Sequence, residues 1–149
     1  MRRRTNIEKV MALRGTDMAQ VSEAVFFLLI SNFLIYLVPL RRWHQWIGRQ
    51  SEQHKETTLS PEQPGRIRQL KENVRRANKL LFNTSKCFAM SLALKKMMSR
   101  RKLPAALYLG VKKDETKNLA AHAWVKSGEN IIYGGKNATE HFKQLISFA

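Results

Sequence analysis

Apolar residues recur every three or four positions in the stretch 66–81. They are Ile67, Leu70, Val74, Ala77 and Leu81. This spacing predicts an amphipathic helix with a basic outer face. A second helix is predicted over 83–98, where good helix formers follow Thr84 and Ser85, two natural N-cap residues. We therefore expect the only cysteine, Cys87, in the first turn of an apolar helix.

Short apolar runs separated by polar turns follow position 103. Strands are predicted over 103–111, 119–125 and 131–133, with polar connections at 112–117 and 127–130. The stretch 139–148 fits either a short helix or a last strand. Helices followed by an antiparallel meander predict an α+β fold, with the helices on one side of a small sheet.

The run Ala24–Val38 is almost continuously apolar and ends at Pro39, before Arg41 and Arg42. It is shorter than the about 20 residues of a membrane span. Two interpretations stay open: a buried or groove-binding helix, and a helix that contacts a membrane. The polar stretch 49–65 predicts a linker. We expect a helical arm over 1–60 and a core domain over 61–149.

Charge and cysteine content narrow the class of protein. The chain carries 27 Lys and Arg against 11 Asp and Glu, a formal charge of +16. Such a surface attracts polyanions, acidic peptides, acidic partner proteins or anionic membranes, without choosing among them. One cysteine excludes an internal disulfide framework, so a cytoplasmic location is expected.

The chemistry of interest is a cysteine paired with a histidine. In the predicted strand 119–125, alternation places His122 on one face with Ala120 and Trp124. If the Cys87 helix packs on that face, His122 can take the thiol proton and the thiolate can attack a peptide carbonyl. Free N–H groups at a helix start favour a thiolate and could hold the oxyanion.

Purely structural roles for the cysteine and the histidine are the alternative to catalysis. A lone Cys in an apolar helix is usually a small buried hydrophobe, and a lone strand His is usually only hydrogen-bonded. One Cys and four scattered His make no zinc ligand set, and no phosphate-binding glycine loop is present. We therefore expect no metal and no cofactor.

An ordered set of motifs resembles the leader peptidases of lasso-peptide biosynthesis in their stand-alone form, half of a split B protein. These belong to the transglutaminase-like cysteine-protease superfamily, which has a papain-like core. The similar segments are Cys87–Leu94, Arg100–Val111, Ala121-His122-Ala123-Trp124-Val125 and the closing 142–148, with a weaker likeness in Val38-Pro39-Leu40-Arg41-Arg42.

The resemblance implies a peptidase that cuts the leader from a ribosomally made precursor, with Cys87 and His122 as catalytic residues. It implies a small leader-recognition protein and a cyclase as partners, and no nucleic acid. The family's acid would fall at Tyr133-Gly134-Gly135, where this chain has none. Its orienting role passes to a backbone carbonyl, water or one of the nearby polar residues Glu129, Asn130 and Asn137.

The alternative is a non-catalytic module of the same fold. Its basic surface would bind an acidic peptide or a nucleic acid.

Overall fold

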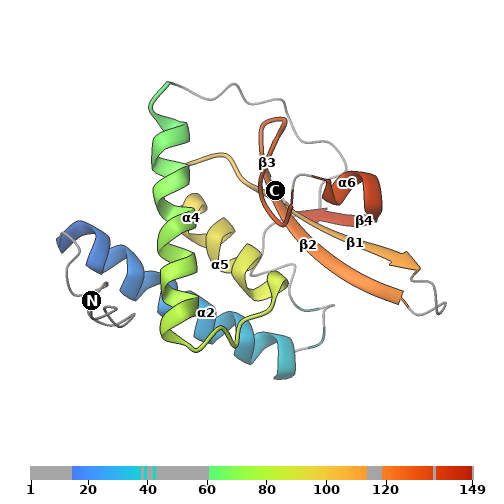
Figure 1. Ribbon diagram of the computed structural model, residues 1–149, viewed down its shortest axis with the longest axis horizontal. Helices are drawn as coiled ribbons and strands as arrows, with labels where there is room; N and C mark the ends of the chain where they lie inside the picture. Colours follow the sequence, from blue (N-terminus) through green and yellow to red (C-terminus); the bar gives the residue numbers. More distant parts are fainter. Residues whose placement is uncertain are drawn as a thin grey trace, which may run out of the picture.

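The fold is α+β, as the order of predicted elements indicated. The computed structural model describes residues 15–37, 39, 42, 61–113, 119–135 and 137–148. The elements are α2 (Gly15–Leu37), α4 (Gln63–Leu80), α5 (Cys87–Arg100), β1 (Ala106–Lys113), β2 (Leu119–Ser127), β3 (Asn130–Tyr133), α6 (Ala138–His141) and β4 (Lys143–Phe148). Figure 1 shows the three long helices on one side and the sheet on the other.

The sheet has the order β3-β2-β1-β4, and every neighbouring pair is antiparallel. The ambiguous stretch 139–148 resolves into both of its alternatives, since α6 is followed by β4. Most of the predicted linker 49–65 and of the connection 112–117 lies outside the described residues. The proposed boundary between an arm over 1–60 and a core over 61–149 therefore stays a prediction.

Helix α5 lies at the centre of the main core. Leu92, Leu94, Met97 and Met98 are fully buried, between α2 and α4 on one side and β1 and β2 on the other. The predicted helix 66–81 is confirmed as α4, which buries Ile67, Leu70, Val74 and Ala77 as the spacing indicated. Because α5 contacts all these elements, its first residue is held where the helices meet the sheet.

A second, smaller cluster covers the opposite face of the sheet. Trp124 is fully buried there with Ala106, Tyr108 and Ala138, and its ring stacks on Tyr108 at 5.7 Å between centroids. Leu107, Ala123 and Val125, by contrast, belong to the main core under α5. Both faces of β2 are thus covered by side chains.

Burial and, to a smaller extent, the positive charge of Lys96 lower the pKa of Lys95 in the middle of α5 to about 8. Between about pH 8 and the ordinary pKa near 10.5, the unfolded chain holds this proton and the folded chain does not. The free energy of unfolding therefore rises with pH across that window, and the cost of the buried charge is fully present below pH 8.

Lys95→Met should accordingly stabilise the protein at pH 7 by roughly 1 to 3 kcal/mol, with the gain shrinking toward pH 10. Chemical denaturation at pH 7 and pH 9.5 measures both values. The exposed Lys102 provides the control variant Lys102→Met, for which little change is expected. A Lys95→Met variant no more stable than the parent at pH 7 would contradict the assignment.

Candidate active site

Cys87 is the first residue of α5, as predicted, and its side chain is half-buried. The turn before it is held by two other helices. The Ser85 amide donates to Asn78 Oδ1 of α4 (3.1 Å), and Asn32 Nδ2 of α2 donates to Ser85 Oγ (2.9 Å). Because these bonds anchor the turn from both sides, the start of α5 is fixed relative to α2 and α4.

The expected capping by Thr84 or Ser85 is wrong. Lys86 takes the N-cap position and makes no side-chain cap hydrogen bond. Ser85 instead forms hydrogen bonds with Asn32 and Asn78. The first bond along the helix runs from the Met90 amide to the Lys86 carbonyl (3.1 Å). Helix starts leave their first N–H groups without a partner inside the helix. At Cys87 such groups can stabilise a thiolate or an oxyanion.

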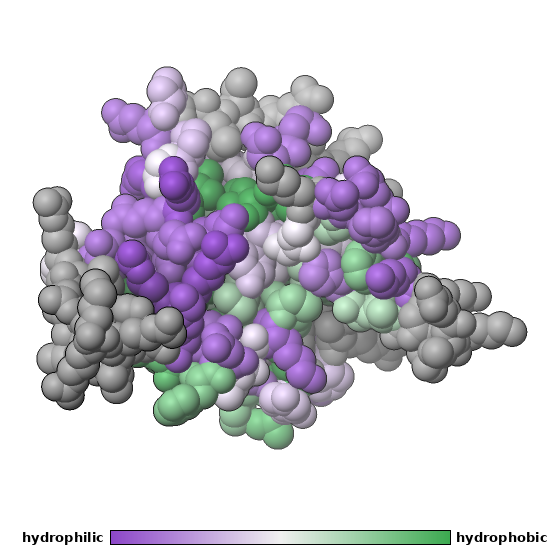
Figure 2. Space-filling model, viewed as in Figure 1, coloured by the Kyte–Doolittle hydropathy of each residue, from purple (hydrophilic) through white to green (hydrophobic). Residues whose placement is uncertain are grey.

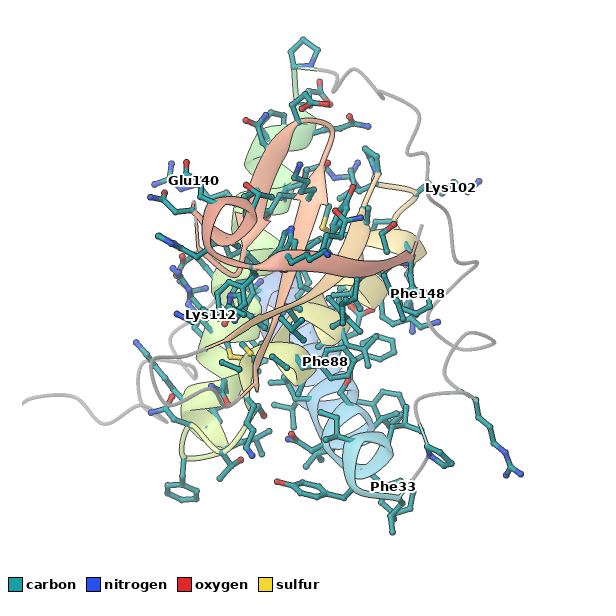
Figure 3. The ribbon with its side chains drawn as sticks, turned by 90° about the vertical axis from the view of Figure 1, so that its right-hand side faces the viewer. Phe33, Phe88, Lys102, Lys112, Glu140 and Phe148 are labelled. Carbon is teal, nitrogen blue, oxygen red and sulfur yellow. The ribbon has the colours of Figure 1, made fainter. Side chains whose placement is uncertain are left out.

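Tyr133, at the end of β3, faces this helix start. Its hydroxyl donates to Met90 Sδ of α5 (3.0 Å). Burial raises the pKa of Tyr133, the nearby positive charge of Arg75 lowers it, and a negative charge on Cys87 raises it. Tyr133 therefore lies close enough to both Cys87 and Arg75 of α4 for their charges to act on it. Figure 3 shows how the sheet lies against α5 from a second direction.

Sequence reasoning assigned no role to Tyr133 beyond marking where the family's acid is missing. Its contact with α5 depends on the pairing of β3 with β2, in which Tyr133 lies opposite Val125 and the register shifts between Val125 and Lys126. Such a shift leaves no signal in the sequence pattern.

His122 lies on the other face of β2. His122 and Trp124 are two residues apart on β2, so their side chains lie on the same face. The His122 ring centroid lies 6.4 Å from that of Trp124 and 4.8 Å from that of Phe142. Helix α5 packs instead on the face of Ala123, where Ser91 Oγ donates to the Ala123 carbonyl (3.3 Å). The expectation that α5 covers the face of Ala120, His122 and Trp124 is therefore wrong.

Within 61–113 and 119–135, no hydrogen bond joins the Cys87 thiol to the His122 imidazole. The His122 Nε2 instead contacts the carbonyl of Gly134 at 2.5 Å. Because a carbonyl oxygen only accepts, Nε2 carries the proton and Nδ1 is left as the acceptor of the neutral ring.

The carbonyl of Gly134 thus stands where the family's carboxylate was expected. Of the alternative partners considered, Glu129 and Asn130 lie at the turn between β2 and β3 and are exposed. In the described part of the chain, no carboxylate forms a hydrogen bond or ion pair with His122. Among the described residues, no three His, Cys, Asp or Glu side chains lie close enough together to hold a metal ion.

A comparison with known families decides the class of this fold. The family model described as "Transglutaminase-like superfamily" matches residues 34–147, which is more than half of the chain. The chain belongs to the transglutaminase-like superfamily. The matched region contains α4, α5, β1 to β3 and all of β4 except its last residue, and with them Cys87, His122 and Tyr133. No curated protein and no solved structure matches the chain significantly.

The superfamily generally includes cysteine proteases and transglutaminases. Both use a cysteine thiolate to attack an acyl group, so the half-buried Cys87 at the start of α5 is compatible with a cysteine-peptidase type of fold. The superfamily match leaves the substrate unspecified.

Proposed function

We propose that this protein is a cysteine peptidase that removes the leader from a ribosomally made lasso-peptide precursor. It would act with a separate leader-recognition protein and a cyclase. The observation that carries the proposal is the position of Cys87, half-buried at the first residue of α5 in a transglutaminase-like chain. The ordered motifs 87–94, 100–111 and 121–125 support the choice of substrate class.

The proposed reaction has two steps. The Cys87 thiolate attacks the scissile carbonyl, forming a thioester with the leader, while the imidazolium of His122 protonates the departing amine of the core peptide. Water then adds to the thioester with His122 as general base, releasing the leader acid and the thiol. Backbone N–H groups at the start of α5 hold the oxyanion in both steps.

Among the residues that the structure describes, no hydrogen bond joins the Cys87 thiol to the His122 imidazole, whose Nε2 contacts the Gly134 carbonyl. The proposed proton transfer therefore needs a contact that the described hydrogen bonds do not include. A partner that binds the competent conformation more tightly raises its population. We therefore expect the peptidase to be inactive alone and active in the presence of precursor and recognition protein.

The basic face of α4 supports an acidic leader as the bound partner. Arg66, Arg68, Arg75 and Lys79 are exposed along it, and Figure 2 shows hydrophilic side chains gathered over α4. Among the described residues of this face, Arg75 pairs with Glu72 (2.9 Å) and also acts on Tyr133 beside Cys87. A leader lying along the face would therefore reach the site.

Replacing Arg68 and Arg75 by Glu should weaken binding of the leader or its recognition protein about tenfold at low salt, because charge reversal replaces attraction by repulsion. The effect should shrink as salt rises. Fluorescence anisotropy with a labelled leader, with and without recognition protein, measures it. Lys143→Glu on β4 is the matched control, an exposed cation outside α4. Unchanged affinity and cleavage would refute the assignment of this face.

The experiment that tests the proposed function combines the protein with a candidate precursor and recognition protein. Mass spectrometry should find two fragments whose masses sum to that of the precursor plus one water. Omission of either partner should abolish the products. An intact precursor under all conditions would overturn the proposal.

A second candidate is a non-catalytic module that binds an acidic peptide. The observation favouring it is that, within the described residues, His122 contacts a backbone carbonyl in place of an acid and has no hydrogen bond to the Cys87 thiol. It predicts leader binding that survives Cys87→Ala and His122→Ala, falls with salt and leads to no cleavage.

A further inference from the structure

Helix α2 exposes a stripe of large apolar side chains. Phe26, Leu29, Phe33, Tyr36 and Leu37 are each between 53 and 73% exposed. Their spacing of three and four residues places them along one face of the helix. By length and composition α2 could cross a membrane. Large contiguous apolar surfaces of this kind mark sites of interaction.

The opposite face of α2 is already packed. Val21, Ala24 and Leu28 are buried in the main core, where α2 contacts α4 and α5. Glu23 forms ion pairs with Arg101 (2.6 Å) and Arg100 (3.2 Å) of the α5 end. Crossing a bilayer would strip α2 from this core and expose its partners. The stripe therefore suits a surface against which α2 can lie flat.

Positive charge borders the stripe at both ends. The guanidinium of Arg100, 64% exposed at its side chain, lies 5.8 Å from the Phe27 ring centroid. At the other end Arg42 is exposed, and it stands in an acid-free sequence that runs from Ala24 to Ser51 and contains Arg41, Trp43 and Trp46. Aromatic residues next to arginines are typical of segments at a membrane interface.

We propose that α2 docks, parallel to the surface, on an anionic lipid bilayer. The exposed stripe would enter the boundary between headgroups and acyl chains, while Arg42, Arg100 and the formal charge of +16 hold the anionic headgroups. Protein interfaces combine an apolar centre with a polar rim of mixed hydrogen-bonding groups. Of the five stripe side chains only Tyr36 can hydrogen bond, and tyrosine is itself enriched at membrane interfaces, which favours lipid. This inference is independent of the proposed catalysis.

Phe33 illustrates the geometry. Figure 3 shows it at the lower edge of the molecule, near the end of α2 and away from the sheet. Nothing else on the described surface combines this length of apolar helix with flanking cations.

Flotation with vesicles tests the proposal on the full chain. Vesicles of phosphatidylglycerol and phosphatidylcholine should carry the protein up the gradient, and pure phosphatidylcholine vesicles should carry much less. The double variant Leu29→Ser, Phe33→Ser should bind at least about tenfold more weakly, because two inserted side chains are lost. The control is Phe82→Ser, which removes a 91% exposed phenylalanine outside α2 and should leave binding unchanged.

Circular dichroism of both variants confirms that the fold persists. Equal binding by the double variant and the parent would overturn the proposal, since charge alone would then explain adsorption. Failure to float with anionic vesicles would overturn it as well. So would a dimer, seen by analytical ultracentrifugation of the parent and lost in the double variant, because a second copy would then cover the stripe.

Discussion

Replacing Cys87 by Ala should lower the rate of precursor cleavage at least about 10⁴-fold, with the fold and leader binding retained. Removing the nucleophile of a covalent mechanism leaves only binding and oxyanion stabilisation, which account for a small part of the acceleration. The half-buried side chain loses only one atom, so stability should change little. Single-turnover cleavage with recognition protein, followed by mass spectrometry, measures the loss.

His122→Ala should lower the same rate about 10²- to 10⁴-fold, the range expected for a general acid–base residue. His141→Ala is the matched control, because His141 is exposed at the end of α6 and should not affect the rate. Full activity of Cys87→Ala would remove the thiol from the mechanism. Full activity of His122→Ala with an inactive Cys87→Ala would show that a group other than His122 transfers the proton, and Tyr133, which interacts electrostatically with Cys87, would be the next residue to replace.

Gly134→Ala should lower the free energy of unfolding by roughly 3 to 5 kcal/mol. Gly134 has φ +101°, which L-residues rarely adopt. A Cβ there would lie 2.4 Å from Trp124 Cβ and 2.7 Å from the Ala123 carbonyl oxygen. Neither atom can move without displacing β2. Urea denaturation of parent and variant measures the difference.

Gly135→Ala measures the cost of backbone strain at a positive φ without a steric clash of the added Cβ. Gly135 has a similar φ of +96°, yet a Cβ there would meet no atom within 4 Å. Its substitution should therefore cost only about 1 to 2 kcal/mol of backbone strain. The Gly134 variant should also reduce cleavage beyond its loss of stability, because the Gly134 carbonyl holds the His122 ring. Equal stability losses for the two variants would contradict the close approach of Gly134 to Trp124.

Much of the fold was predictable because its signals are local. The three- and four-residue spacing in α4 defines one buried face, and the apolar helix formers after Ser85 place Cys87 at a helix start. The end of the chain was ambiguous since α6 has only four residues. Helix α2 could not be divided into a packed and an exposed face, because its sequence is apolar on both.

The site was harder to predict because it depends on which face of β2 meets α5. Alternation shows that His122 and Trp124 share a face, but it cannot select the face that α5 covers when both are buried. Trp124 fills a second cluster with Tyr108, while Ala123 and Val125 leave room for the helix. The hydrogen bond of Tyr133 to Met90 of α5, and its electrostatic interactions with Arg75 and Cys87, join residues far apart in sequence and have no local signal.

The central claim is that Cys87 is the acyl-accepting nucleophile of a leader peptidase. Rapid acid quenching of protein, recognition protein and precursor, followed by intact mass spectrometry, tests it most directly. We predict a species heavier than the protein by the mass of the leader less one water, carried by the peptide that contains Cys87 and absent from Cys87→Ala. Cleavage products that form without this species, and equally fast in Cys87→Ala, would contradict the claim.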